Sequence, residues 1–173
     1  MTQKYNVAVA GATGAVGTEI VQILEQRNFP IDKLFLLASS KSKGKKVEFR
    51  DQEIVVEDLS EFDFSKAHIG LFSPGGKISA EFAPKAAKAG CIVIDNTSHF
   101  RMQQNIPLIV PEVNANALDD FFDDENRTNI ISNPNCSTIQ MVVALKPLHD
   151  KAIINRVVVS TYQAVSGAGK TGM

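Results

Sequence analysis

The sequence contains no tryptophan and only two cysteines among its 173 residues. Cys91 and Cys136 form no Cys-x-x-Cys pair, so neither a disulfide scaffold nor a metal site is expected. No apolar run approaches the roughly 20 residues that span a membrane, and the first residues lack the apolar core of a secretion signal. These absences predict a cytoplasmic protein without a membrane partner, in a reducing compartment that keeps thiols usable.

An excess of one charge is also missing, because 18 Lys and Arg stand against 19 Asp and Glu. No basic stripe interleaved with aromatic residues occurs, and nucleic acid is therefore not expected as a partner. A chain of this length can bury one good hydrophobic core and a little more.

Short apolar segments alternate along the chain with segments of helical apolar spacing. This alternation is typical of an α/β protein with a Rossmann-type doubly wound parallel sheet. Strands are expected at 7–10, 34–38, 53–56, 68–72, 91–94 and 129–131, and helices at 16–27, 79–89 and 137–148. Pro84 is expected to place the true start of the second helix later, because proline disrupts a helix interior.

Two further segments are interpreted by composition. The acidic stretch 119–125 is expected to be a solvated surface loop. The β-rich run 157–165 is expected to be a strand, which either joins the first sheet or opens a second domain. A solitary strand has little stability of its own, so we favour the second possibility.

A glycine-rich turn lies between the first predicted strand and the first predicted helix. Gly11 permits a sharp turn, Gly14 lets the backbone approach a pyrophosphate, and Gly17 allows close packing of helix on sheet. A helix N-terminus after such a turn faces the phosphates. In this context the turn predicts a dinucleotide site rather than a purely structural bend.

The segment after the second predicted strand favours NADP over NAD. An acidic residue at this point normally binds the ribose hydroxyls of NAD, but the chain has Ser39, Lys41, Ser42 and further lysines there. Hydroxyl groups and lysine charges suit a 2′-phosphate. The alternative is a solvated basic loop without a ligand.

Cys136 follows an Asn-Pro-Asn turn at the point where a strand end meets a helix N-terminus. Unpaired backbone N–H groups there favour a thiolate, which predicts a nucleophile. The alternative is a small buried hydrophobic residue, as free cysteine often is. A nucleotide and an activated thiol in one chain suggest acyl chemistry on sulfur coupled to hydride transfer.

Arg101 follows the fifth predicted strand, at the ligand-binding edge of the sheet. It could hold a phosphate or a carboxylate bidentately, or it could form a salt bridge to a local acid. His68, His99 and His149 are expected on the surface, or as residues that support the site without touching the substrate, rather than as bases for Cys136.

Taken together, these residues closely resemble the N-terminal part of the bacterial aspartate-semialdehyde dehydrogenase family. The matching blocks cover essentially the whole chain in the family's order. They are residues 11–17, 38–45, 72–76, 93–102, 110–114, 133–138 and 160–169. The resemblance implies NADPH-dependent reductive dephosphorylation of L-aspartyl-4-phosphate to L-aspartate 4-semialdehyde, which feeds lysine, methionine and threonine synthesis.

The resemblance also implies roles for individual residues. Cys136 would form the acyl thioester, Arg101 would bind phosphate, and Gln163 would orient the substrate with Asn135. Cofactor contacts would come from Gly11, Thr13, Gly14, Ala15, Val16, Ser39, Lys41, Ser42, Ser73, Ser166 and Gly167.

In length the chain departs from the family, whose members are about twice this size. The resemblance places the general-base His, a substrate-binding Arg and most contacts of a homodimer or dimer of dimers beyond Met173. We therefore expect residues 1–134 to form the NADP-binding Rossmann domain. Residues 135–173 would supply the nucleophile helix and first strand of a truncated catalytic and dimerisation domain, and such a fragment would bind cofactor without turnover.

Two other functions remain open from the sequence. N-acetyl-glutamyl-phosphate reductase uses the same chemistry, but its nucleophile usually has Gly before it and Tyr after it, whereas Asn135 and Ser137 flank Cys136 here. A non-catalytic NADP-binding module is the alternative of a different class, because no candidate base follows the cysteine.

Overall fold

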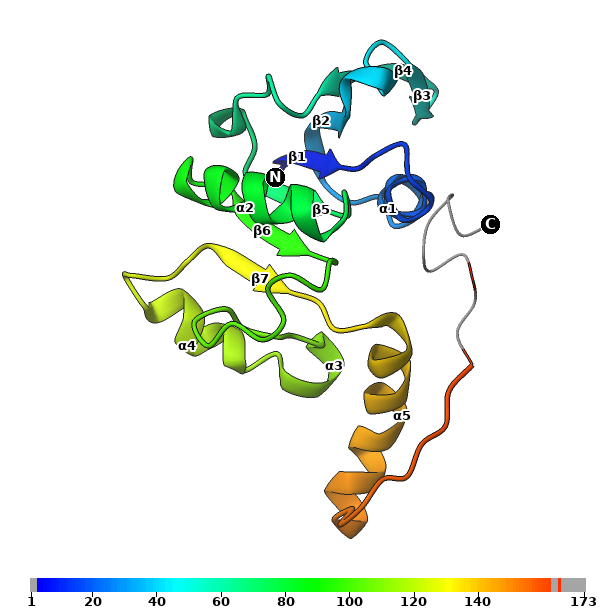
Figure 1. Cartoon of the computed structure of the whole chain (residues 1–173), viewed down its shortest axis with the longest axis vertical. Helices are drawn as coiled ribbons and strands as arrows, with labels where there is room; N and C mark the ends of the chain where they lie inside the picture. Colours follow the sequence, from blue (N-terminus) through cyan, green and yellow to red (C-terminus); the bar gives the residue numbers. More distant parts are fainter. Residues whose placement is uncertain (1–2, 163–164, 166–173) are drawn as a thin grey trace.

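The computed structural model describes residues 3–162 and residue 165. Its centre is a seven-stranded sheet in the order β3-β4-β2-β1-β5-β6-β7 (Figure 1). Neighbouring strands pair in parallel except β3, which pairs antiparallel with β4. The strands are β1 Tyr5–Ala10, β2 Ile31–Ala38, β3 Lys46–Phe49, β4 Gln52–Asp58, β5 Ile69–Phe72, β6 Ile92–Asp95 and β7 Ile130–Ser132. Apart from the added β3 edge, this is the strand order of a doubly wound dinucleotide-binding fold, which confirms the predicted fold class.

Helices lie on both faces of the sheet and below its β7 edge (Figure 1). The α-helices are α1 Ala15–Gln26, α2 Gly76–Lys88, α3 Pro111–Asn114, α4 Ala117–Asp123 and α5 Cys136–Ala152, and the short 3₁₀ helices are η1 Ser40–Ser42 and η2 Phe64–Lys66. Within the described residues, no helix is long and apolar enough to cross a lipid bilayer.

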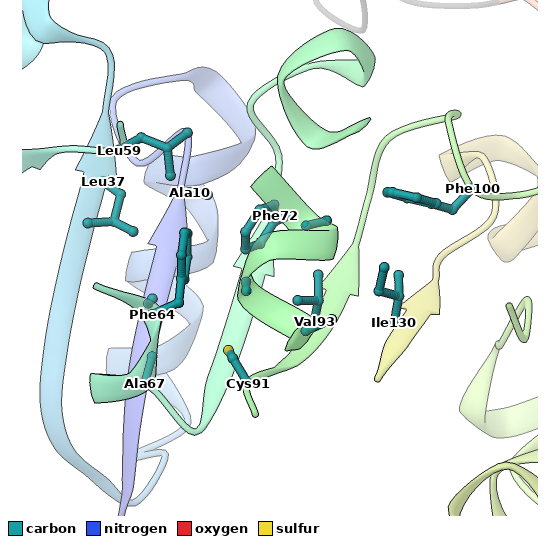
Figure 2. Packing of buried hydrophobic residues seen from close by; sticks show 14 of the residues in the cluster. Ala10, Leu37, Leu59, Phe64, Ala67, Phe72, Cys91, Val93, Phe100 and Ile130 are labelled. Atoms are coloured by element: carbon teal, nitrogen blue, oxygen red, sulfur yellow. The ribbon is translucent and has the colours of Figure 1, made fainter. Parts of the chain in front are cut away.

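Two hydrophobic clusters hold helices against the two faces of the sheet. Because strand side chains alternate, Ala8 and Ala10 face one cluster while Val7 and Val9 face the other. Figure 2 shows the cluster under α2, where Phe72 lies fully buried between strands and helix. Burial on both faces explains why the parallel strands read as continuous apolar runs.

The prediction that Pro84 delays the second helix is wrong. Helix α2 begins at Gly76 and contains Pro84 in its interior. Proline there removes one backbone donor, but Ala83, Ala86 and Ala87 around it are buried against the sheet. Tertiary packing of this apolar face therefore outweighs the local cost.

The acidic stretch was also misassigned, because α4 covers most of it. Its carboxylates are exposed as expected, but Leu118 and Phe121 are partly buried. These two apolar side chains recur at a helical spacing of three, which the charge pattern concealed.

Strand β3 was not predicted at all. It forms a two-residue hairpin with β4, and the turn residues Arg50 and Asp51 both have positive φ, 50° and 59°. Glycine or asparagine normally marks such a turn, and neither is present at these two positions.

The predicted strand at 157–165 is not found over residues 157–162, while residues 163 and 164 lie outside the described residues. Val158 and Tyr162 are 80% and 102% exposed. β-propensity alone does not make a strand, because the backbone groups need a neighbouring strand. In residues 3–162 no strand pairs with this segment.

Candidate active site

The glycine-rich turn joins β1 to α1 at the carboxyl edge of the sheet. Gly11 has φ of +84°, and a Cβ there would lie 2.8 Å from the carbonyl oxygen of Ser73. A Cβ on Gly17 would lie 2.1 Å from the carbonyl oxygen of Gly11. The positive φ at Gly11 and the close packing at Gly17 confirm the predicted roles of these two glycines.

A pocket of about 470 Å³ opens beside this turn. Five of the predicted cofactor residues line it, namely Gly11, Thr13, Gly14, Ser39 and Ser73. They come from the ends of β1, β2 and β5, where a change in strand order creates a crevice in folds of this type. The pocket thus has the position and the backbone surface that a dinucleotide requires.

Four other predicted cofactor residues do not line the pocket. Ala15 and Val16 begin α1, so their N–H groups are among those that a helix leaves unpaired at its N-terminus, where phosphate binds. Lys41 is exposed on η1, whereas Ser42 is buried and its hydroxyl lies 3.4 Å from that of Thr13. Ser42 therefore contacts Thr13 of the glycine-rich turn but does not line the pocket.

The end of β4 supplies pocket residues that sequence reasoning missed. Asp58 pairs in parallel register with Ala38 of β2 and lines the pocket together with Leu59 and Ser60. The backbone N–H and the hydroxyl of Ser60 both donate to Asp58 Oδ1, at 2.9 and 2.7 Å. These hydrogen bonds hold the pKa of the Asp58 carboxyl below its usual range.

The signal for these residues is their place just after a predicted strand. The predicted strand 53–56 ends two residues before Asp58, and a polar residue at that distance lies at the ligand-binding edge of the sheet. Ser40 and Pro74 also line the pocket, as do Ile78 and Phe82 of α2. Helical residues that face a pocket from above carry no distinct sequence signal.

Cys136 is exposed and is the first residue of α5. Asn135 caps this helix, because its Oδ1 accepts from the backbone N–H of Ser137 at 3.0 Å and from its hydroxyl at 2.6 Å. The Cys136 sulfur lies 3.9 Å from the same oxygen. Exposure at a capped helix start confirms the predicted placement and rejects a buried structural cysteine.

The other cysteine, Cys91, lies in a buried environment. Cys91 is fully buried between α2 and the sheet (Figure 2). Burial raises the pKa of its thiol to about 12. Of the two cysteines, only Cys136 is therefore exposed to a ligand.

Arg101 is tied to the turn that precedes Cys136. Its Nε donates to the carbonyl oxygen of Asn133 and its Nη2 to that of Asn96, both at 2.9 Å. The side-chain amide of Asn133 donates to the side-chain oxygen of Asn96 at 2.7 Å. No carboxylate lies within salt-bridge distance of Arg101 in the described part of the chain, so a local salt bridge does not occupy it.

A buried carboxylate anchors the loop from 96 to 101. Asp95 accepts from the backbone N–H of Thr97 at 2.7 Å, from its hydroxyl at 2.6 Å, and from the hydroxyl of Ser79. Burial raises the pKa of Asp95, against the lowering effect of the Thr97 hydrogen bonds. The Asp95 carbonyl also accepts from the N–H of Asn133 at 2.8 Å. These hydrogen bonds hold the loop that carries Arg101 and the turn that precedes Cys136 in place at the ends of β6 and β7.

Three predicted site residues, Gln163, Ser166 and Gly167, lie outside the described residues. The three histidines are exposed, as expected. Among the residues the structure describes, no three His, Cys, Asp or Glu side chains gather as a metal site would require.

The fold and the site define a dinucleotide-binding α/β protein with an exposed cysteine at a helix N-terminus. A family model described as "semialdehyde dehydrogenase, NAD binding domain" matches residues 6–121, and one described as "semialdehyde dehydrogenase, dimerisation domain" matches residues 145–173. The chain belongs to the semialdehyde dehydrogenase family.

Relatives in this family carry a more specific name. Aspartate-semialdehyde dehydrogenase 2 of Vibrio cholerae is 57% identical over 173 residues, which is all of this chain and 50% of that protein. The aspartate-semialdehyde dehydrogenase of Aquifex aeolicus is 57% identical over 166 residues, 95% of this chain and 48% of that protein. The chain spans about half the length of these curated relatives.

Solved structures agree with this relationship. A crystal structure of Vibrio cholerae aspartate semialdehyde dehydrogenase II complexed with ASA superimposes with a TM-score of 0.93 at 56% identity, covering 99% of this chain and 50% of that one. The aspartate semialdehyde dehydrogenase of Candida albicans, solved with NADP, gives a TM-score of 0.70 at 26% identity, with 88% of this chain and 48% of that chain covered.

Proposed function

We propose that this chain is the cofactor-binding and nucleophile-bearing part of an NADP-dependent aspartate-semialdehyde dehydrogenase. The reaction is reductive dephosphorylation of L-aspartyl-4-phosphate to L-aspartate 4-semialdehyde. The observation that carries the proposal is Cys136, exposed at the first position of α5 and linked through Asn133 to Arg101. The names of the relatives support the choice of substrate.

The chemistry follows from the groups at this edge of the sheet. The Cys136 thiolate attacks the acyl carbon, a C–S bond forms, and the C–O bond to phosphate breaks. Arg101 has an Nη1 without a hydrogen-bond partner among the described residues, and it is suited to hold the phosphate. Backbone N–H groups at the start of α5 are candidates to bind the oxyanion.

The second half of the reaction needs a hydride. Reduced nicotinamide bound in the pocket would supply it, and the Cys136 thiolate would leave as the thioester becomes the aldehyde. The resemblance places a general base in the other half of the family's chain. This base would transfer a proton to or from the substrate oxygen of the Cys136-bound hemithioacetal. We also propose a cytoplasmic location, which agrees with two free cysteines, and assembly as a homodimer or dimer of dimers, which the dimerisation-domain match supports.

The test is phosphate-dependent reduction of NADP with aspartate semialdehyde, using the complete polypeptide that carries this sequence. We expect activity that Cys136→Ser abolishes and Cys91→Ala retains, because Cys91 lies in the core on the α2 face. N-acetyl-glutamate semialdehyde serves as the rival substrate. Preference for that substrate would assign the chain to the reductase, and cofactor binding without turnover of either substrate would indicate a non-catalytic module.

Cofactor preference is a separate prediction. NADPH should bind more tightly than NADH, because Ser39, Ser40 and Lys41 follow β2 where NAD-binding folds carry an acid. Lys41→Ala should narrow the gap between the two cofactors, whereas Lys33→Ala, an exposed lysine early in β2, should not. Calorimetric titration of both cofactors measures this, and equal affinities in the unmodified protein would contradict it.

A further inference from the structure

The cofactor pocket contains an ionised carboxylate that the expected phosphate and ribose contacts do not use. Asp58 ends β4 and is 8% exposed, and it lines the same pocket as the glycine-rich turn. Its Oδ1 accepts twice from Ser60, while its Oδ2 has no hydrogen-bond partner among the described residues. The carboxylate therefore has one oxygen available to a ligand.

The charge state of Asp58 limits what that ligand can present. The Ser60 hydrogen bonds lower the pKa of Asp58, so the group is a carboxylate at neutral pH and can only accept. Lys43, whose charge acts on Asp58, is paired with Glu61 at 2.5 Å, and no cation lies within salt-bridge distance of Asp58 among the described residues. The ligand must therefore offer a donor.

The position of Asp58 distinguishes among the donors of a dinucleotide. An acid that binds the adenosine ribose stands at the end of the strand next to β1, which here is β2. Asp58 pairs with Ala38 of β2 in register, so it lies one strand spacing, about 4.8 Å, farther from β1. A donor beyond the ribose is favoured by this displacement.

The remaining walls of the pocket suit a flat apolar ring. Leu59, which follows Asp58 in the chain, is buried and lines the pocket, as do Ile78 and Phe82 of α2. The other lining residues near the glycine-rich turn are small or hydroxyl-bearing, so Asp58 is the charged group among them. Apolar walls with a few placed polar groups are typical of small-molecule sites. A purine ring between these walls would bring its edge toward the carboxylate.

We propose that Asp58 accepts a hydrogen bond from the exocyclic 6-amino group of adenine, so that the pocket selects adenine dinucleotides over their 6-oxo counterparts. This inference rests on the proposed binding of NADP in the pocket. Asp58 is thus a specificity-determining residue, and Ser60 orients it. A 6-oxo purine would place an acceptor against the carboxylate, leaving both without a partner.

The experiment compares NADPH with nicotinamide hypoxanthine dinucleotide phosphate, the 6-oxo analogue, in the reduced form. Dissociation constants are measured by nicotinamide fluorescence on the complete polypeptide without substrate. We expect the analogue to bind about 10- to 100-fold more weakly, the range for a lost hydrogen bond to a charged group. Equal affinities in the unmodified protein would overturn the proposal without any variant.

Asp58→Asn replaces the free acceptor oxygen by a donor while keeping the hydrogen bonds from Ser60. The amide oxygen can still accept from Ser60, and the amide nitrogen then donates toward the 6-oxo group. We expect the preference for NADPH over the analogue to fall to about threefold or less, or to invert. An unchanged preference would overturn the proposal.

Asp63→Asn is the matched control. Asp63 accepts from the N–H and hydroxyl of Ser65 at 3.1 and 2.7 Å, the same arrangement as Asp58 with Ser60, but it is exposed and outside the pocket. The Asp63→Asn protein should prefer NADPH over the 6-oxo analogue by the same factor as the unmodified protein. Asp58→Asn could instead change the preference for NADPH over NADH while leaving the preference for NADPH over the 6-oxo analogue unchanged. That result would assign the carboxylate to the ribose and overturn the proposal.

Failure of every dinucleotide to bind would refute the proposed function itself.

Discussion

The two cysteines show how strongly residue environment controls one functional group. Cys136 lies at the first position of a capped helix and is exposed, whereas Cys91 is enclosed by α2 and the sheet. A thiolate is the reactive form, and burial in apolar surroundings disfavours it. The difference in reactivity therefore comes from position in the fold, not from side-chain chemistry.

We expect iodoacetamide to label Cys136 at least about a hundredfold faster than Cys91 at neutral pH. With the pKa of Cys91 raised to about 12, almost none of it is thiolate. Mass-spectrometric mapping of labelled peptides over time measures both rates. Cys136→Ser should remove the fast phase and leave the slow one, and earlier labelling of Cys91 would contradict the assignment.

At the scale of elements, the junction of β1 and α1 depends on contact between backbones. Gly17 is buried on α1 where the helix crosses the turn at Gly11. Backbone atoms cannot rotate away as a flexible side chain can. The sheet and its first helix are therefore locked together beside the cofactor pocket.

Gly17→Ala should destabilise the protein by about 1–3 kcal/mol or more, because the new Cβ must displace backbone. It would meet the Gly11 oxygen at 2.1 Å and Ala12 Cα at 2.8 Å. Cofactor binding should weaken with it, since the turn moves. Glu19→Ala, an exposed change on the same helix, should stay within about 0.5 kcal/mol. Urea unfolding of both variants measures the free energies of unfolding. A Gly17→Ala protein as stable as the unmodified protein would contradict the close packing of Gly17 on Gly11.

At the scale of the molecule, the helix that begins at Cys136 extends away from the sheet. Helix α5 extends from the end of β7, and none of its residues is buried (Figure 1). Val143 and Leu148 expose 36% and 59% of their surface. The apolar side chains of α5 are thus without a full set of neighbours in the described residues.

We expect a polypeptide of these 173 residues alone to bind NADPH but to turn over poorly. General acid–base assistance contributes about 10²- to 10⁴-fold, and the family's base would be missing. The full-length enzyme of Vibrio cholerae, whose other half this chain does not span, is the comparison in the phosphate-dependent assay. Turnover by the 173-residue chain within about tenfold of that enzyme would contradict the expectation.

Local sequence predicted the features that depend on few neighbours. The parallel strands are buried on both faces and therefore read as apolar runs, the turn at Gly11 and Gly17 requires glycine, and the Asn-Pro-Asn turn places Cys136 at a helix start. The division at residue 134 into two domains, and the roles of Gln163, Ser166 and Gly167, remain predictions.

What the sequence by itself determined was the α/β alternation, the glycine-rich turn and the position of Cys136 at a helix start, because each depends on short-range spacing. The tertiary structure decided that Cys136 is exposed. Only the tertiary structure decided that Asp58 of β4 joins Ser39 in one pocket and that Asn133 ties Arg101 to the Cys136 turn. The residues of each pair end or follow strands that are neighbours in the sheet but separated in the sequence, β4 with β2 and β6 with β7. The same dependence on neighbours left residues 157–162 without a strand, since no strand of the described residues pairs with them.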